Sequence, residues 1–89
     1  MRTITLELEH IETVAALHIY LQYMLRLPAY YGRNLDALHD MLCAESGDMR
    51  IVLRADGPLS AEMAAYLPRL ARVLADAAQE NGRLRFEMG

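Results

Sequence analysis

The sequence predicts a small α/β protein built on a parallel sheet, and three observations support this. Segments near Thr3–Leu8, Met49–Arg54 and Arg83–Met88 have the alternating or β-rich composition of strands. Stretches with apolar residues at helical spacing separate them, and strands joined by helical crossovers belong in a parallel sheet with right-handed connections. With 89 residues, the chain is long enough for one domain, residues 1–89, and too short for two.

The first strand and the helix after it are predicted from their apolar spacing. Apolar residues alternate along the strand at Ile4, Leu6 and Leu8. Thr13 is a suitable N-cap for a helix that runs to about Leu25. The inward stripe of this helix consists of Val14, Leu17, Leu21, Met24 and Leu25. We expect His10 and His18 to lie at the surface.

The middle of the chain reads as a connection, a short helix and a turn. Segment 27–33 contains a proline and a glycine, which are typical of a connection. Asn34 can cap a second helix, Leu35–Cys43. A turn at residues 45–48 then leads to the second strand.

The last part of the chain is predicted to be helical before the third strand. Ser60 is a possible N-cap. Pro68 either kinks the helix that follows or begins a new one, so we expect three to four helices in all. The pair Asn81-Gly82 is typical of a helix C-terminus.

Composition excludes several classes of protein. The net charge is −3, from 12 acids and 9 arginines, which argues against non-specific binding of nucleic acid. The single Cys43 cannot form an intramolecular disulfide, which is typical of a reducing compartment. The N-terminus lacks the apolar run of a signal peptide, and no stretch is apolar enough to span a membrane. We therefore expect a soluble, cytoplasmic protein without membrane contact.

The predicted second helix has two distinct faces. At about 100° per residue, one face carries three leucines and is expected to be buried: Leu35, Leu38 and Leu42. The opposite face carries Asp36, His39, Asp40 and Cys43. Asp36 and Asp40 are like charges at i, i+4, which cost an isolated helix about 0.2–0.5 kcal/mol. The helix dipole favours Asp36 in the first turn, whereas Asp40 lies beyond it. The charged face is therefore either a solvated surface or a binding surface.

Two other roles for this face are a metal site and an enzymatic site. Asp36, His39 and Cys43 are spaced i, i+3, i+7 and could approach one zinc ion, with Asp40 nearby. No second cluster of Cys or His accompanies them, so we expect no metal site and no cofactor. A helix C-terminus does not lower the pKa of a thiol, which argues against Cys43 as a nucleophile. We therefore expect no catalytic residues.

Residues 30–40, Tyr-Tyr-Gly-Arg-Asn-Leu-Asp-Ala-Leu-His-Asp, resemble the signature of the barstar family, the intracellular inhibitors of the ribonuclease barnase. The approach through residues 25–29 and the passage from residues 80–82 into a closing strand are also similar. The resemblance implies a barstar-like fold, a three-stranded parallel sheet packed by three to four helices. It further implies an antitoxin- or immunity-type protein from a bacterium that binds and blocks a barnase-like or other small basic ribonuclease. We expect the chain to be a monomer, with weak self-association as the alternative.

The resemblance also implies roles for individual residues. Carboxylates on the second helix, Asp36 and the main anchor Asp40, would take the places of substrate phosphates. Tyr30 would stack on a catalytic residue of the enzyme, and Asn34 would hold the loop or contact the partner. Asp76 would add an acid from the last helix, although it could instead form an i, i+4 pair with Arg72. The full expected partner-binding set is Tyr30, Asn34, Asp36, His39, Asp40, Cys43, Ala44 and Asp76.

The chain departs from the family pattern at the expected surface. His39 replaces a Trp between the two acids, Arg33 replaces an acid, and Ala44 and Glu45 replace Gly and Trp. The loss of aromatic positions removes contact area of the kind that anchors interfaces. The target is therefore expected to differ from barnase. The alternative function is a regulatory interaction module with the same fold and no nuclease partner.

Overall fold

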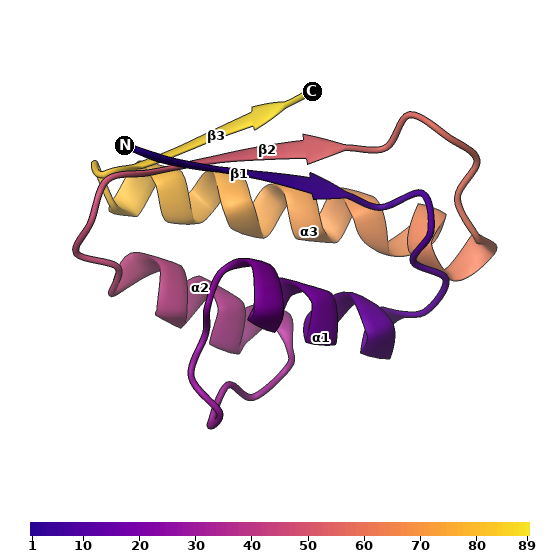
Figure 1. The fold of residues 1–89 in the computed structure, drawn as a ribbon, viewed down its shortest axis with the longest axis horizontal. Helices are drawn as coiled ribbons and strands as arrows, with labels where there is room; N and C mark the ends of the chain where they lie inside the picture. Colours follow the sequence, from indigo (N-terminus) through magenta and orange to yellow (C-terminus); the bar gives the residue numbers. More distant parts are fainter.

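The computed structural model describes all residues, 1–89. Three strands are joined by three helices, two between the first and second strands and one between the second and third (Figure 1). In chain order the elements are β1 (Arg2–Glu7), α1 (Val14–Met24), α2 (Leu35–Cys43), β2 (Met49–Arg54), α3 (Ala61–Glu80) and β3 (Leu84–Met88). No helix is both long enough and apolar enough to cross a membrane.

The sheet is fully parallel, as the crossover argument predicts. Its strand order is β1-β2-β3, so β2 is central. Ile51 of β2 is in register with Ile4 on one side and with Phe86 on the other. All three helices lie on the same side of the sheet (Figure 1). The strand residues that point to the other face are mostly polar, with Val52 as the apolar exception. The predicted three-stranded parallel architecture is confirmed.

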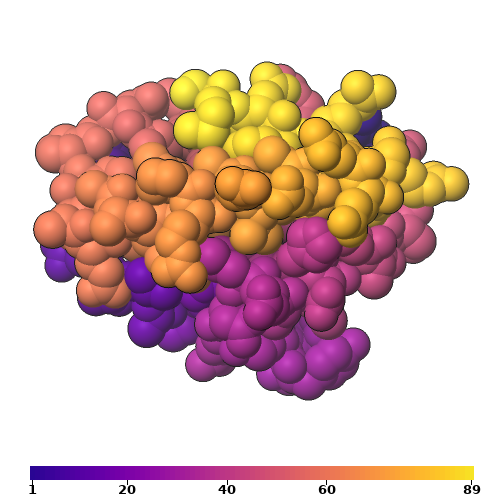
Figure 2. Space-filling view, turned by 180° about the vertical axis from the view of Figure 1, so that it is seen from behind, coloured from indigo at the N-terminus to yellow at the C-terminus, as the bar shows by residue number.

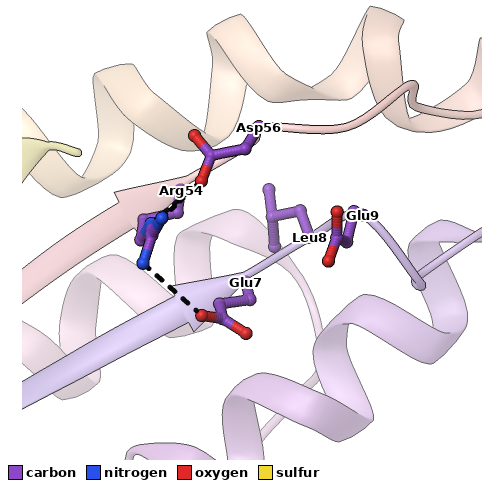
Figure 3. Close-up of a pocket in the computed structure, with 5 residues that line it drawn as sticks. All are labelled: Glu7, Leu8, Glu9, Arg54 and Asp56. Carbon is purple, nitrogen blue, oxygen red and sulfur yellow. Dashed lines mark hydrogen bonds and ion pairs between the residues drawn. The ribbon is translucent and has the colours of Figure 1, made fainter.

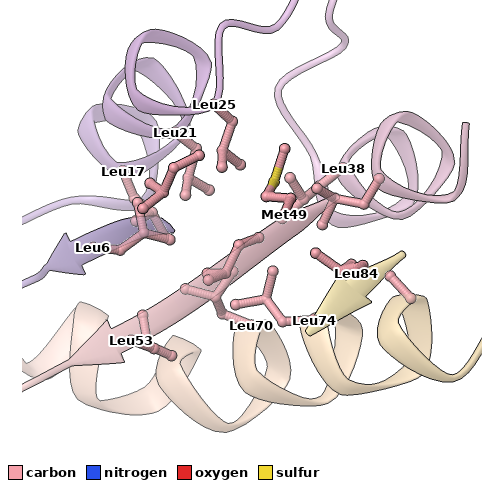
Figure 4. Close-up of a cluster of buried hydrophobic side chains, with 14 of the residues drawn as sticks. Leu6, Leu17, Leu21, Leu25, Leu38, Met49, Leu53, Leu70, Leu74 and Leu84 are labelled. Carbon is pink, nitrogen blue, oxygen red and sulfur yellow. The ribbon is translucent and has the colours of Figure 1, made fainter. Parts of the chain in front are cut away.

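The core lies between the sheet and the helices. Alternate residues of the strands point into it together with leucines of all three helices (Figure 4). Its fully buried members include Leu6, Leu17, Leu21, Leu38, Leu42, Ile51, Leu53, Leu70 and Leu74. Met88 is 55% exposed although it continues the alternation of Leu84 and Phe86, and it is the last residue of an edge strand.

A single helix, α3, spans the region in which Pro68 was expected either to kink a helix or to begin a new one. Ser60 caps it, because its hydroxyl accepts from the backbone N–H of Met63 at 3.1 Å. The helix continues through Pro68, which is exposed and leaves one backbone carbonyl without its helical donor. The chain therefore has three helices, and Pro68 does not begin a new one.

The prediction that His18 lies at the surface is wrong. His18 is only 1% exposed, whereas the side chain of His10 is 92% exposed. His18 follows Leu17 and precedes Leu21 by three positions, so it lies on the edge of the inward stripe of α1. Two tyrosine hydroxyls supply the hydrogen bonds that a buried imidazole requires.

A small hollow lies at the carboxyl ends of β1 and β2 (Figure 3). Arg54 pairs there with Asp56 at 2.6 Å and with Glu7 at 3.7 Å. Glu9 and Leu8 complete the lining. The ion pairs largely neutralise the arginine, and no side chain of α2 takes part.

Candidate partner-binding surface

The helix α2 is fixed to the core through one face and begins and ends where the sequence predicts. Asn34 caps it, because Oδ1 accepts from the backbone N–H of Ala37 at 2.7 Å. Leu38 and Leu42 are buried, and Leu35 is partly buried against the core. Ala44 is the C-cap residue. This anchoring directs the opposite face of α2 to solvent.

The two aspartates of the outward face are exposed and lack an arginine partner. Neither Asp36 nor Asp40 forms an ion pair with an arginine. The side chain of Asp40 is 81% exposed, and the one basic group near it is Nδ1 of His39 at 4.0 Å. A like-charged pair one turn apart that no arginine of the chain neutralises is available to an external cation.

Arg33 does not place its charge on this acidic pair. Its Nε and Nη2 both lie 3.3 Å from Oε1 of Gln22 on α1. The guanidinium is thus directed toward Gln22 of α1, although Arg33 is close to Asp36 along the sequence. The negative potential of α2 is therefore less compensated than the sequence indicates.

The loop before α2 has a defined conformation. It starts with a Schellman turn, in which Leu27 N–H donates to Gln22 O at 2.9 Å and Arg26 N–H donates to Tyr23 O at 3.3 Å. Arg26 has φ 54° and Arg33 has φ 55°, so a residue in the left-handed region stands near each end of the loop. The loop projects from the helical layer away from the sheet (Figure 1).

Two successive tyrosines of the loop have opposite environments. Tyr30 is 79% exposed, whereas Tyr31 is 4% exposed. The hydroxyl of Tyr31 lies 2.7 Å from Nδ1 of His18 and 3.5 Å from the backbone carbonyl oxygen of Asn34. Tyr31 therefore ties the loop and the start of α2 to α1, and Tyr30 is presented to solvent beside it.

The C-terminal ends of α2 and α3 are joined by Asn81. Its Nδ2 donates to the backbone oxygens of Leu42 at 2.9 Å and Glu45 at 3.0 Å. These bonds cap two carbonyls at and just beyond the end of α2, where the helix supplies no donor four residues further on. Figure 2 shows α2 (magenta) and α3 (orange) side by side on one face of the molecule.

At this junction His39 and Cys43 meet a residue of α3, Glu80. The Sγ atom of Cys43 lies 3.3 Å from Oε2 of Glu80, and Nε2 of His39 lies 3.4 Å from the same oxygen. Burial raises the pKa of the Cys43 thiol, and the hydrogen bond and charge of Glu80 raise it further, as does the charge of Asp40. A thiol with a raised pKa is a poor nucleophile at neutral pH.

Asp76 lies on α3 one turn before Glu80. Its Oδ2 is 3.9 Å from Nε of Arg72, and its side chain is 55% exposed. The i, i+4 pair between Arg72 and Asp76, which the sequence allowed as an alternative to a partner contact, is thus formed. Because both side chains are largely exposed, the pair holds Asp76 only weakly.

The family model of Barstar (barnase inhibitor) matches residues 1–88. The chain belongs to the barstar family. Comparison with curated protein sequences gave no significant match. Proteins of the barstar family are inhibitors and not enzymes, which confirms the expectation of a non-enzymatic chain.

Within this barstar-family chain, Asp36 and Asp40 are exposed as predicted, whereas His39 and Cys43 of the same predicted outward face are half-buried. Two further residues were missed from the sequence. Only the packing of α3 against α2 brings Glu80 to His39 and Cys43. His18 was missed as the partner of Tyr31. Its spacing from Leu17 and Leu21 was the available signal for burial.

Proposed function

We propose that this chain binds a ribonuclease and blocks its active site with α2 and the loop before it. The observation that carries this proposal is the exposed pair Asp36 and Asp40, which has no arginine partner on a helix that is firmly anchored by its other face. Membership of the barstar family supplies the class of partner.

The proposed mechanism is mimicry of the substrate's phosphates. A carboxylate accepts two hydrogen bonds from an arginine in a geometry similar to that of a phosphate. In the complex, Asp40 is the main anchor in the cationic cleft of the enzyme, and Asp36 binds a neighbouring cation. A negative surface that faces a basic cleft also accelerates encounter, and this gain decreases as salt increases.

Tyr30 adds an aromatic contact to this electrostatic attraction. Its ring is exposed, and the buried Tyr31 restricts the loop that carries it, so little conformational entropy is lost when the ring stacks on the enzyme. His39 occupies the position between the two acids and contributes a smaller ring there than a tryptophan would. A nuclease with a matching surface therefore differs in shape from barnase.

The remaining residues of the proposed interface act around this centre. Asn34 positions the loop, since its amide caps α2 and its Nδ2 donates to Gly32 O at 3.2 Å. Cys43 and Ala44 form the edge of the contact at the end of α2. Asp76 reaches the enzyme from α3. We propose that the chain acts as a monomer inside the cell, where the free Cys43 stays reduced.

Titration of ribonuclease activity tests the proposal. A small basic ribonuclease of the barnase family from the same organism is assayed on RNA with increasing amounts of the chain. We expect activity to fall to zero at one inhibitor per enzyme. If the activity is unaffected, and the chain instead captures a protein without nuclease activity, it is a regulatory interaction module and the proposal is wrong.

A further inference from the structure

Three potential metal ligands converge where the C-terminal parts of α2 and α3 meet. His39 and Cys43 come from α2, and Glu80 comes from the last turn of α3. One ligand atom of each lies within 4.8 Å of the others. From the sequence we expected no metal site, and the trio considered there used Asp36 as the carboxylate; Asp36 is not part of this cluster.

The separations within the cluster match one face of a tetrahedron around zinc. A Zn²⁺ ion bonds sulfur at about 2.3 Å and nitrogen or oxygen at about 2.0–2.1 Å, which separates neighbouring ligand atoms by about 3.3–3.6 Å. The measured separations are 3.4 Å from His39 Nε2 to Glu80 Oε2, 3.3 Å from Cys43 Sγ to that oxygen, and 3.7 Å from Sγ to Nε2. Small side-chain adjustments therefore suffice to bind the ion.

The chemistry of the three groups selects the same ion. Imidazole, thiolate and carboxylate together favour Zn²⁺ over the hard cations Mg²⁺ and Ca²⁺, which prefer oxygen ligands. The two ring nitrogens of His39 lie 3.8 and 3.7 Å from Sγ, and Nε2, the nearer of them, also lies 3.4 Å from Glu80, which makes it the candidate ligand. Nδ1 lies 4.0 Å from Oδ1 of Asp40, beyond hydrogen-bond distance, so Asp40 orients the ring only if its side chain moves closer.

The scaffold holds the two helices in place before an ion arrives. Asn81 clamps the end of α2 to the end of α3, and the leucines of both helices are buried in one core. We propose that His39, Cys43 and Glu80 form a Zn²⁺ site with three protein ligands and a fourth position open to solvent. This site shares His39 and Cys43 with the proposed nuclease interface, but its test needs no nuclease, so the two proposals can fail separately.

Binding of the ion has two consequences. The Cys43 thiol gives up its proton, which leaves to solvent, and the thiolate bonds Zn²⁺. Because the complete ligand set exists only when α2 and α3 are packed together, the ion binds the native state and stabilises it against unfolding.

Cobalt and zinc titrations of the reduced, tag-free chain test the proposal. We expect one Co²⁺ per chain with a thiolate charge-transfer band in the near ultraviolet and the visible bands of tetrahedral Co²⁺. We expect Zn²⁺ to displace it and to raise the melting temperature. Cys43→Ser, His39→Gln and Glu80→Gln each lower the affinity for Zn²⁺ at least about tenfold.

Asp36→Asn and Asp76→Asn are matched controls, because each removes an exposed acid from one of the same two helices. Both should bind Zn²⁺ as the natural chain does. Melting curves recorded without metal separate the loss of a ligand from the loss of the fold in every variant. The proposal is overturned if the natural chain binds neither ion, if Glu80→Gln binds Zn²⁺ unchanged, or if the controls lose the metal to the same extent.

Discussion

The hydroxyl of Tyr31 lies 2.7 Å from Nδ1 of the buried His18. The other ring nitrogen, Nε2, lies 2.9 Å from the hydroxyl of Tyr66 on α3. A neutral imidazole has one donor and one acceptor nitrogen, so two hydroxyls satisfy it completely. The cluster thereby joins α1, α3 and the loop that presents Tyr30.

Tyr31→Phe should lower the free energy of unfolding by about 1–3 kcal/mol, because it leaves Nδ1 of His18 buried without a partner. Urea denaturation measures the change. Tyr23→Phe is the matched control, since Tyr23 is 80% exposed and its hydroxyl is free to bond water. Equal effects of the two substitutions would contradict the anchoring role of Tyr31.

Stability should decrease as the pH falls through the titration range of His18. Burial lowers the pKa of His18 from its ordinary value of 6.5. Below pH 6.5 the unfolded chain therefore takes up a proton at this position more readily than the native chain, which favours unfolding. Well above that pH the residue is neutral in both states, so it no longer makes the free energy of unfolding depend on pH.

Urea denaturation between about pH 5 and pH 7.5 measures this dependence. His18→Gln should flatten the profile, whereas His10→Gln, which alters an exposed histidine, should leave its slope unchanged. Identical slopes for the natural chain and His18→Gln would show that other groups cause the acid sensitivity.

Leu38→Ala should cost about 2–5 kcal/mol of stability, because it leaves a cavity beneath α2. Leu38 is fully buried and holds the acidic helix to the core. Thermal or denaturant unfolding measures the loss. Ala37→Gly alters the neighbouring position without a large cavity and should cost only about 1 kcal/mol. A similar loss in both variants would mean that helix propensity, and not core packing, anchors α2.

The features that could be predicted from the sequence are those set by local pattern. The bounds of α2 follow from the cap Asn34 and the leucine spacing, and both were predicted as they occur. The parallel pairing of β1 and β2 follows from the helical crossover between them. Asp36 and Asp40 point outward because the leucine face on the opposite side of α2 is buried.

The features that escaped prediction depend on contacts between distant segments. Glu80 reaches Cys43 across 37 positions of the chain, and His18 reaches Tyr66 across 48. The periodicity of one helix carries no information about which side chain of another helix will face it. Arg33 likewise turned to Gln22 because the loop folds back on α1.

Asp76→Ala should weaken binding to the cognate ribonuclease by about tenfold or less. The residue reaches the partner from α3, at the edge of the proposed contact, and its exposed pair with Arg72 contributes little to stability. Titration calorimetry measures the dissociation constant. A loss larger than that of Asp40→Ala would move the centre of the interface from α2 to α3.

Asp40→Ala tests the central claim, that the acidic face of α2 is an inhibitory surface. The substitution should leave stability nearly unchanged, or raise it by about 0.2–0.5 kcal/mol, because it relieves repulsion with Asp36. Binding to the cognate ribonuclease should nevertheless weaken at least about thirtyfold, since cations of the enzyme would be buried without a partner. The decisive measurement is titration calorimetry of both proteins against that enzyme. We expect a large loss of affinity with a melting temperature equal to or slightly above that of the natural chain. Equal affinities would show that this face of α2 is a solvated surface and not a binding surface.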